Sequence, residues 1–277
     1  MPLAVTEFTL LEQTAFLTLY ARALDSRWPN PVLHDTLADE IVGRIDYDFA
    51  GFDVPANIVC QTALRAKMLD DRVRDFTAHH PDAVVVELGA GLNTPMMRVG
   101  PPAGVDWYSV DLPRVIALRD AVVPPAERAH SIAASLATGD WTDGIPAGRP
   151  TMLIADGLFA FVPVPVIVAL VGRIVEHFGS GELAFNDYGR VGRLSWLAMK
   201  LAPQGMFGVI GSQWVNPGFK AADVPETWHP RLRLVEEASL THAPEVDLFP
   251  PRIRVVTRLA GRTKAGARKA RILRYRF

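Results

Sequence analysis

The chain has 277 residues, a mass of 30.4 kDa and 49% hydrophobic residues, so it can bury one large core. Its formal net charge of −1 gives no general attraction to nucleic acid or to an anionic membrane, and we expect neither as a partner. The single cysteine, Cys60, excludes an internal disulfide framework and indicates a reducing compartment, in which it would be a small buried apolar residue.

The sequence predicts neither a signal peptide nor a membrane-spanning segment. Residues 1–13 include Glu7 and Glu12 and contain no basic region of the kind that opens a signal peptide. The longest apolar stretch, residues 161–171, contains two prolines and is too short to cross a bilayer. We therefore expect a cytoplasmic protein. The sequence leaves open whether it is a monomer or a homodimer.

Taken in chain order, apolar residues first recur at helical spacing and then form short runs that alternate with helical patterns. The leading helices are predicted over residues 10–26, 34–45 and 58–80. The strands are predicted over residues 83–88, 105–110, 129–133, 151–155 and 182–186, and the clearest helices between them over 113–122 and 163–178. Such alternation is typical of an α/β fold, a doubly wound and mostly parallel sheet with helices on both faces.

The last third departs from this alternation. Residues 201–237 are rich in Gly, Pro and Trp, and their aromatic content predicts an insertion that covers a site. From Gly261 onward the chain carries Arg and Lys but no acidic residue. Ile253, Val255 and Thr257, followed by Ala270 to Tyr275, predict two antiparallel strands whose basic side chains discourage edge pairing; a grip on nucleic acid is the less favoured alternative.

Two motifs at the ends of neighbouring predicted strands indicate a nucleoside site. The run from Val84 ends in Gly89-Ala90-Gly91, where the backbone can turn sharply and a ligand can approach closely. Asp111 ends the next strand, 20 residues after Gly91, where an acidic side chain accepts both ribose hydroxyls of a bound nucleoside. The spacing suits NAD or S-adenosylmethionine, and the lack of a third glycine before Pro95 favours S-adenosylmethionine.

Arg22 and Arg65 each continue an apolar stripe of a predicted helix, so each guanidinium points inward and needs an anionic partner. One interpretation is a structural salt bridge, for instance with Asp25 or Asp70. The other is capture of a ligand carboxylate, which S-adenosylmethionine carries on its methionine arm and NAD lacks.

Other chemistries find no support in the residue pattern. The seven histidines show no metal-ligand spacing, so no metal site is expected. The chain also lacks a G-x-S-x-G nucleophile elbow, a phosphate loop that ends in Gly-Lys-Ser/Thr, and the surroundings of a catalytic cysteine.

Together these features resemble the class I S-adenosylmethionine-dependent methyltransferases of the leucine carboxyl methyltransferase family, especially its bacterial branch of polyketide O-methyltransferases. The resemblance covers nearly the whole chain. Its motifs are Tyr20-Ala21-Arg22-Ala23 with Asp35-x-x-Ala38, Arg65-Ala66-x-x-Leu69-Asp70, Glu87 to Asn93, Trp107 to Pro113, Ser135 to Trp141, and Asp156-Gly157 before Phe161. The resemblance implies a Rossmann-like seven-stranded sheet with leading helices and a C-terminal antiparallel hairpin.

The resemblance also implies a site for S-adenosylmethionine. Arg22 and Arg65 would hold the methionine carboxylate, Asp156 would face the amino group, and Gly89 would face the methionine arm. Asp111 would take the ribose. The adenine would lie against Ser135 and Leu136. Glu87, Gly91 and Leu112 would complete the site.

On this basis residues 1–277 are expected to form a single methyltransferase domain. Its segments would be a helical cover over 1–81, the nucleoside-binding core over 82–200, a substrate-covering insertion over 201–240 and the final strands over 241–277. The expected activity is O-methylation of a carboxylate or hydroxyl of a small molecule, and the resemblance implies a polyketide-type secondary metabolite as the substrate.

No catalytic residue is assigned from sequence. Methyl transfer to a carboxylate needs no base, whereas a phenol or enol could use Asp187 or Tyr188, which follow the fifth predicted strand. The family usually has Asp, Arg, Glu and Tyr where this chain has Asn93, Pro95, Asp156 and Phe161. These departures leave open a catalytically weak or inactive S-adenosylmethionine-binding protein. A further alternative, within the enzyme class, is a methyltransferase for a protein C-terminal carboxylate.

Overall fold

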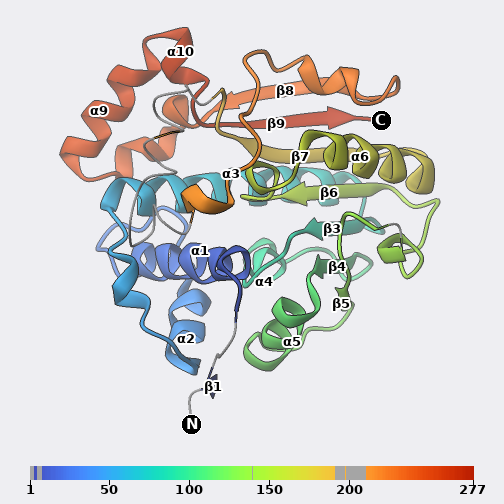
Figure 1. Ribbon diagram of the computed structural model, residues 1–277, viewed down its shortest axis with the longest axis horizontal. Coiled ribbons are helices and arrows are strands. Elements are labelled where there is room, and N and C mark those ends of the chain that lie inside the picture. Colours follow the sequence, from blue (N-terminus) through green and yellow to red (C-terminus); the bar gives the residue numbers. More distant parts are fainter. Residues whose placement is uncertain (1–2, 5–7, 139, 191–196, 198–209) are drawn as a thin grey trace.

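The computed structural model describes residues 3–4, 8–138, 140–190, 197 and 210–277, and its centre is a seven-stranded sheet (Figure 1). The strands are β3 (Val84–Leu88), β4 (Asp106–Asp111), β5 (Ala129–Ala133), β6 (Thr151–Ala155), β7 (Glu182–Asp187), β8 (Arg233–Ser239) and β9 (Arg271–Arg276). They are ordered β5-β4-β3-β6-β7-β9-β8. The first five are parallel, and β9 runs antiparallel between β7 and β8. The predicted fold class is therefore confirmed.

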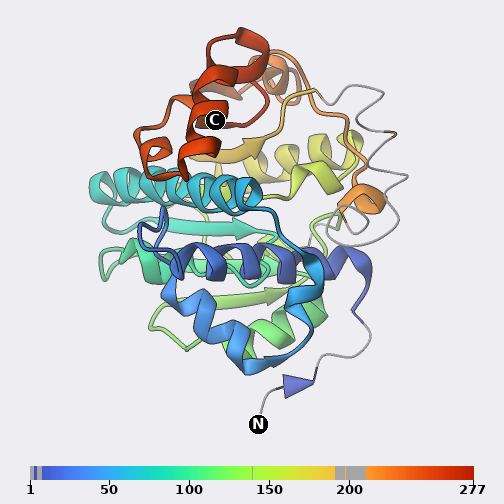
Figure 2. The ribbon, with the colours of Figure 1, turned by 90° about the vertical axis from the view of Figure 1, so that its left-hand side faces the viewer.

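Helices flank the sheet on both faces, and α1 and α2 lie at the carboxyl ends of its parallel strands (Figures 1 and 2). The helices are α1 (Leu10–Ser26), α2 (Thr36–Arg44), α3 (Ala56–His79), α4 (Pro95–Val99), α5 (Pro113–Val122), α6 (Val164–Phe178), α9 (Pro251–Gly261) and α10 (Lys264–Ala267). Short 3-10 turns are η1 (Phe49–Phe52), η2 (Asp140–Thr142), η3 (Phe159–Phe161), η4 (Val224–Thr227), η5 (Leu240–His242) and η6 (Pro244–Leu248), and β1 (Leu3–Ala4) pairs in parallel with β2 (Ile45–Asp46). Viewed from that end, α1 and α2 lie in front of the strands (Figure 2).

Alternation along the central strand explains why both faces are covered. All five residues of β3 are buried. Val84 and Val86 pack into the core that contains α6, whereas Val85 packs into the core that contains Leu69 and Val73 of α3. Because successive strand residues point to opposite faces, an unbroken apolar strand needs a helix layer on each side.

The local patterns predicted most element boundaries. Helices α1 and α5 and strands β5 and β6 have the predicted bounds, and the other predicted helices and strands of residues 10–187 differ by a few residues at their ends. Pro163 caps helix α6 from outside and does not form its first turn. Cys60 is fully buried, as expected. In the part of the chain that the structure describes, no helix has the length and apolarity needed to cross a bilayer.

Two predictions about the C-terminal third are wrong in detail. The segment expected to supply the first hairpin strand, around Ile253 to Thr257, is helix α9, which Pro251 opens at a position that suits proline. The antiparallel partner of β9 is instead β8, which lies inside the 201–240 segment predicted as an insertion. Residues 201–209 of that segment lie outside the described residues.

Candidate functional site

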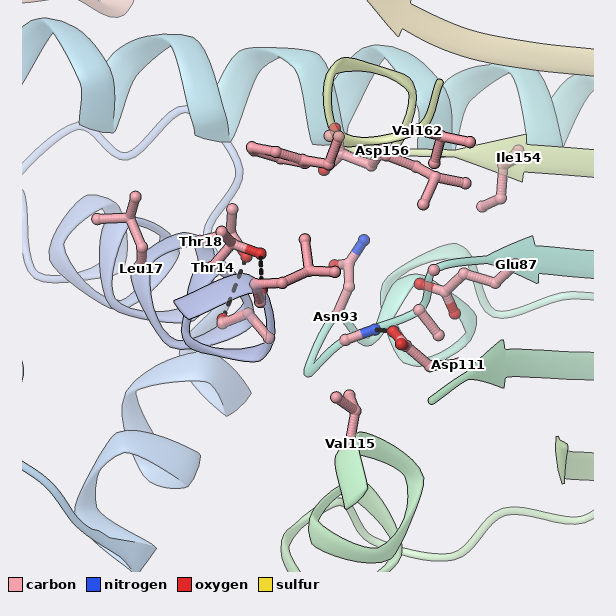
Figure 3. Close-up of a pocket in the computed structure, with 18 of the residues that line it drawn as sticks. Thr14, Leu17, Thr18, Glu87, Asn93, Asp111, Val115, Ile154, Asp156 and Val162 are labelled. Carbon is pink, nitrogen blue, oxygen red and sulfur yellow. Dashed lines mark hydrogen bonds between the residues drawn. The ribbon is translucent and has the colours of Figure 1, made fainter. Parts of the chain in front are cut away.

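All ten residues predicted to bind the nucleoside cofactor line a cavity of about 510 Å³. They are Arg22, Arg65, Glu87, Gly89, Gly91, Asp111, Leu112, Ser135, Leu136 and Asp156. Figure 3 labels Glu87, Asp111 and Asp156 among them. The cavity lies between α1 and the carboxyl ends of β3, β4 and β6. Strand order reverses between β3 and β6, and open α/β sheets bind ligands at such a point. The volume is within the range of small-molecule pockets, roughly 300–1,000 Å³.

The turn after β3 needs both of its glycines. Gly89 and Gly91 have φ angles of +66° and +52°, which side chains disfavour. A Cβ atom on Gly89 would lie 2.9 Å from Cδ1 of Leu158, and one on Gly91 would lie 3.3 Å from Cβ of Ala15. The turn is therefore packed tightly between α1 and the segment after β6, with its backbone along the cavity.

Asp111 is held in place by the backbone around it. Its Oδ2 accepts a hydrogen bond of 2.7 Å from the Gly91 N–H, and its Oδ1 accepts one of 2.7 Å from the Leu112 N–H. Each carboxylate oxygen can accept a further hydrogen bond. Burial raises the pKa of Asp111, although both N–H groups oppose the rise. The two predicted motifs are thus physically joined, with the carboxylate fixed at the cavity wall.

Glu87 carries an unsatisfied buried atom at the same wall. Its Oε2 accepts hydrogen bonds from the Ser109 hydroxyl at 3.3 Å and the Trp107 indole at 3.4 Å, and it lies 3.7 Å from the Arg119 guanidinium. No described residue donates a hydrogen bond to its Oε1. Burial raises the pKa of Glu87 to about 7. The Glu87 Oε1 is therefore suited to accept a hydrogen bond from a ligand, because a buried polar atom without a partner destabilises the fold.

Arg22 is buried and anchored from three directions. Its Nε lies 3.0 Å from Oδ2 of Asp35, its Nη1 donates to the Thr18 carbonyl at 3.2 Å, and its Nη2 donates to the Leu92 carbonyl at 2.9 Å. Among the described residues, these bonds occupy three of the five N–H groups of the guanidinium. Arg22 therefore has a structural salt bridge and still presents donors at the cavity.

The ion-pair partners suggested by the sequence are wrong for Arg22. Asp25 accepts backbone hydrogen bonds from residues 32–34. Asp70 forms a two-pronged pair with Arg98, at 2.7 and 3.1 Å. Arg98 also lies 2.8 Å from Asp35, the partner of Arg22. Two arginines and two aspartates thus form one buried network that joins α1, α3 and α4.

Sequence reasoning missed Arg98 and Arg119, which hold the segment after the glycine turn. Arg119 donates to the carbonyls of Gly91 and Asn93, and Arg98 donates to the Asn93 side-chain oxygen at 3.0 Å. Arg119 follows Val115 by one turn on an apolar helix stripe, the same signal that selected Arg22 and Arg65. The pattern around Arg98 gave no such signal, because α4 has only five residues.

Arg65 and Asp156 form a largely buried ion pair, with Asp156 on the side of the cavity opposite Asp111 (Figure 3). The Arg65 Nε lies 2.6 Å from the Asp156 Oδ1, yet neither atom makes an aligned hydrogen bond with a described residue. The Arg65 Nη1 donates to the Tyr188 hydroxyl at 2.6 Å. Burial raises the pKa of Tyr188, which keeps the phenol neutral near pH 7 and makes it a poor base.

Of the two candidate bases, Asp187 and Tyr188, only Tyr188 is placed at the cavity. Tyr188 lines the cavity, but Asp187 does not: its Oδ2 lies 2.7 Å from the Arg271 Nε and accepts a bond from the Gly189 N–H. Trp214 packs on Tyr188 with ring centroids 5.0 Å apart and on Phe161 at 6.2 Å. These three aromatic rings form what we call the aromatic wall, and Trp214 comes from the segment expected to cover the site.

The remaining predicted residues follow β5. The Ser135 Oγ accepts a hydrogen bond of 3.3 Å from the Ala137 N–H, and the Leu136 carbonyl accepts one of 2.5 Å from Arg173. Both residues are half-buried. On the α1 side the cavity is bordered by Thr14 and Thr18, which the sequence did not single out (Figure 3). Within the described residues, no three His, Cys, Asp or Glu side chains are grouped to hold a metal ion.

Comparisons with known proteins agree with this geometry. The profile of the leucine carboxyl methyltransferase family matches residues 15–175. The tetracenomycin polyketide synthesis O-methyltransferase TcmP of Streptomyces glaucescens is 38% identical over 178 residues, which are 64% of this chain and 66% of that protein. The S-adenosyl-L-methionine-dependent methyltransferase dpfgK of Gibberella zeae is 29% identical over 202 residues, covering 65% and 67% of the two chains. The chain thus spans about two thirds of the length of these relatives.

A solved structure supports the fold. A putative methyltransferase from Thermobifida fusca superposes with a TM-score of 0.57 over 92% of this chain and 93% of that one, at 16% sequence identity. At that identity the likeness concerns the architecture alone.

Proposed function

Because the chain belongs to the leucine carboxyl methyltransferase family, we propose that it is an S-adenosylmethionine-dependent O-methyltransferase that acts on a small molecule. The observation that carries this proposal is the hydrogen bond between the Gly91 N–H and Asp111 at the wall of a cavity that also contains the Arg65–Asp156 pair. One end of the cavity is thereby suited to a nucleoside and the other to an amino acid.

The residues present fit the cofactor group by group. Asp111 would accept hydrogen bonds from the ribose hydroxyls, since each of its carboxylate oxygens can accept one more. The Arg65–Asp156 pair would hold the amino-acid end, with its cation for the carboxylate and its anion for the ammonium. Arg22 would add donors to the carboxylate, and the free Oε1 of Glu87 supports the presence of a donor or cation nearby.

The cofactor would supply a methyl group on a positively charged sulfur, and the transfer neutralises that charge. The chain would therefore need to align the acceptor and exclude water more than to provide strong acid or base groups. The apolar side of the cavity fits this task, because Leu11, Ile58, Ile210 and Phe161 line it. Arg65 orients the neutral Tyr188 hydroxyl, which could donate a hydrogen bond to an oxygen of the methyl-accepting substrate.

We propose a polyketide-type acceptor that presents a carboxylate or an acidic hydroxyl. The name of the Streptomyces relative, a polyketide synthesis O-methyltransferase, supports the acceptor class. The aromatic wall of Phe161, Tyr188 and Trp214 supports a flat, apolar molecule, because aromatic rings pack well against such surfaces.

Calorimetry tests the cofactor directly. S-adenosylmethionine and S-adenosylhomocysteine should bind with micromolar dissociation constants, and NAD should give no heat. Absence of heat with the first two ligands would refute the proposal. Transfer of radiolabelled methyl to a panel of aromatic carboxylic acids, phenols and peptides with free C-termini then identifies the acceptor. Binding without any transfer would favour the inactive binding protein, and transfer to the peptides alone would favour protein carboxyl methylation.

A further inference from the structure

The C-terminal helix α9 exposes an apolar face to solvent. Val255, Val256 and Leu259 lie on that face at i, i+1 and i+4, and their exposed fractions are 54%, 66% and 50%. Arg252 precedes them on the same face by one turn, and Arg262 follows the last of them by three residues. The face is therefore an apolar stripe with a cation at each end, which we call the α9 stripe.

The opposite side of α9 fixes this orientation. Ile253 packs against the core beneath α3, and Gly261 lies so close to η5 that a Cβ atom would be 2.6 Å from the Thr241 hydroxyl. Ile253, Thr257 and Gly261 are spaced by four residues and share the inner face. The apolar stripe cannot turn inward without losing these contacts.

The charge around the α9 stripe is one-sided. All 30 acidic residues of the chain precede residue 248, whereas ten of its 29 basic residues follow that point. Arg258 and Arg268 are paired with Asp247 and Glu237, at 3.1 and 3.2 Å. Between residues 251 and 270, four exposed cations form no ion pair with any described residue; they are Arg252, Arg262, Lys264 and Lys269.

The stripe lies at the same end of the sheet as the cavity. Strand β9 is antiparallel to β7, and its first residue, Arg271, pairs with Asp187 at the carboxyl end of β7. Helices α9 and α10 immediately precede β9, so they are placed at that end (Figures 1 and 2). A partner bound there would lie on the side of the molecule where the parallel strands end.

We propose that the α9 stripe docks an acidic amphipathic helix of another protein. Such a helix would cover Val255, Val256 and Leu259 with its apolar face and place carboxylates against the four unpaired cations, in the manner of an apolar interface centre with a charged rim. This surface goes beyond the proposed methyl transfer and does not depend on it.

Other occupants match the surface less well. Helices that lie in a lipid interface anchor through Trp, Phe or several Leu side chains, whereas the α9 stripe offers one leucine and two valines. A second copy that pairs this face with itself would place arginines against arginines. Nucleic acid would neutralise the cations but leave the aliphatic stripe in water.

The test uses the full-length protein and a fluorescent synthetic helix with leucines on one face and glutamates on the other. Fluorescence anisotropy should show binding at least tenfold tighter than that of a scrambled peptide of the same composition. The double variants V255S/V256S and R252E/R262E should each weaken binding tenfold or more. Arg231→Glu, an exposed cation that precedes β8 at the other end of the sheet, should leave it within twofold.

Four outcomes would overturn the proposal. Equal affinity for the scrambled peptide would reduce the effect to bulk charge, and full affinity in either double variant would place binding elsewhere. Association with phosphatidylglycerol vesicles but not with the peptide would assign the stripe to a lipid surface. A dimer seen by sedimentation and lost in V255S/V256S would assign it to a second copy. Thermal unfolding of each variant shows that the fold is retained, as expected for exposed positions.

Discussion

Replacing Asp111 with Ala tests the nucleoside site at the position where its geometry is clearest. The substitution removes two acceptor oxygens that the backbone of Gly91 and Leu112 holds in place. A net hydrogen bond to a charged group contributes about 1.5–3 kcal/mol, and a ribose hydroxyl that remains bound to water recovers part of this. We expect S-adenosylmethionine to bind about 1–3 kcal/mol more weakly, which is a 5- to 150-fold increase in its dissociation constant.

The variant also leaves the Gly91 N–H without its acceptor, so binding must be separated from folding. Asp111→Asn retains one oxygen and should fall between wild type and Asp111→Ala. Asp106→Asn is a matched control, because Asp106 begins the same strand, pairs with Arg128 at 2.9 Å, and does not line the cavity. Calorimetric affinity is measured for each variant after thermal unfolding confirms that it is folded. Wild-type affinity in folded Asp111→Ala would refute the assignment of the ribose.

Three further predictions address the buried charges and the aromatic wall. Burial raises the pKa of Glu87 from 4.5 to about 7, so between these pH values the folded protein retains a proton that the unfolded chain releases. The free energy of unfolding should therefore fall as the pH rises from 4.5 to about 7. In urea titrations, Glu87→Gln should remove about 3 kcal/mol of that fall. An unchanged pH slope would contradict this. Arg98→Ala leaves the buried carboxylate of Asp70 without its arginine and Asp35 with Arg22 alone, and should cost about 3–5 kcal/mol. Arg27→Ala, which breaks an exposed pair, should cost below about 1 kcal/mol; similar losses would show that the network is unimportant. Trp214→Ala should raise the KM for the methyl acceptor about tenfold and leave S-adenosylmethionine affinity within twofold, and the reverse result would move the acceptor away from the aromatic wall.

The sequence by itself determined most of the local architecture and ten of the residues that line the cavity. The spacing of apolar residues gave α1 and β6 their bounds, because that spacing reports which side of an element is buried. Two glycines and an acid at strand ends predicted that Gly91 and Asp111 lie at one site, since the parallel strands of one sheet end at the same edge; their direct hydrogen bond was not predicted. Arg22 was likewise predicted to point inward from its place on an apolar stripe.

Only the tertiary structure decided which side chains meet across distant elements. Arg22 pairs with Asp35 and with the Leu92 carbonyl, 70 residues away, and no local pattern distinguishes that aspartate from Asp25. The region around Val255 shows the same limit: its apolar residues were predicted to form a strand, and the structure has a helix there, with Ile253 against the core and Gly261 close to Thr241. Periodicity records whether a residue is buried, whereas its partner depends on the packing of whole elements against one another.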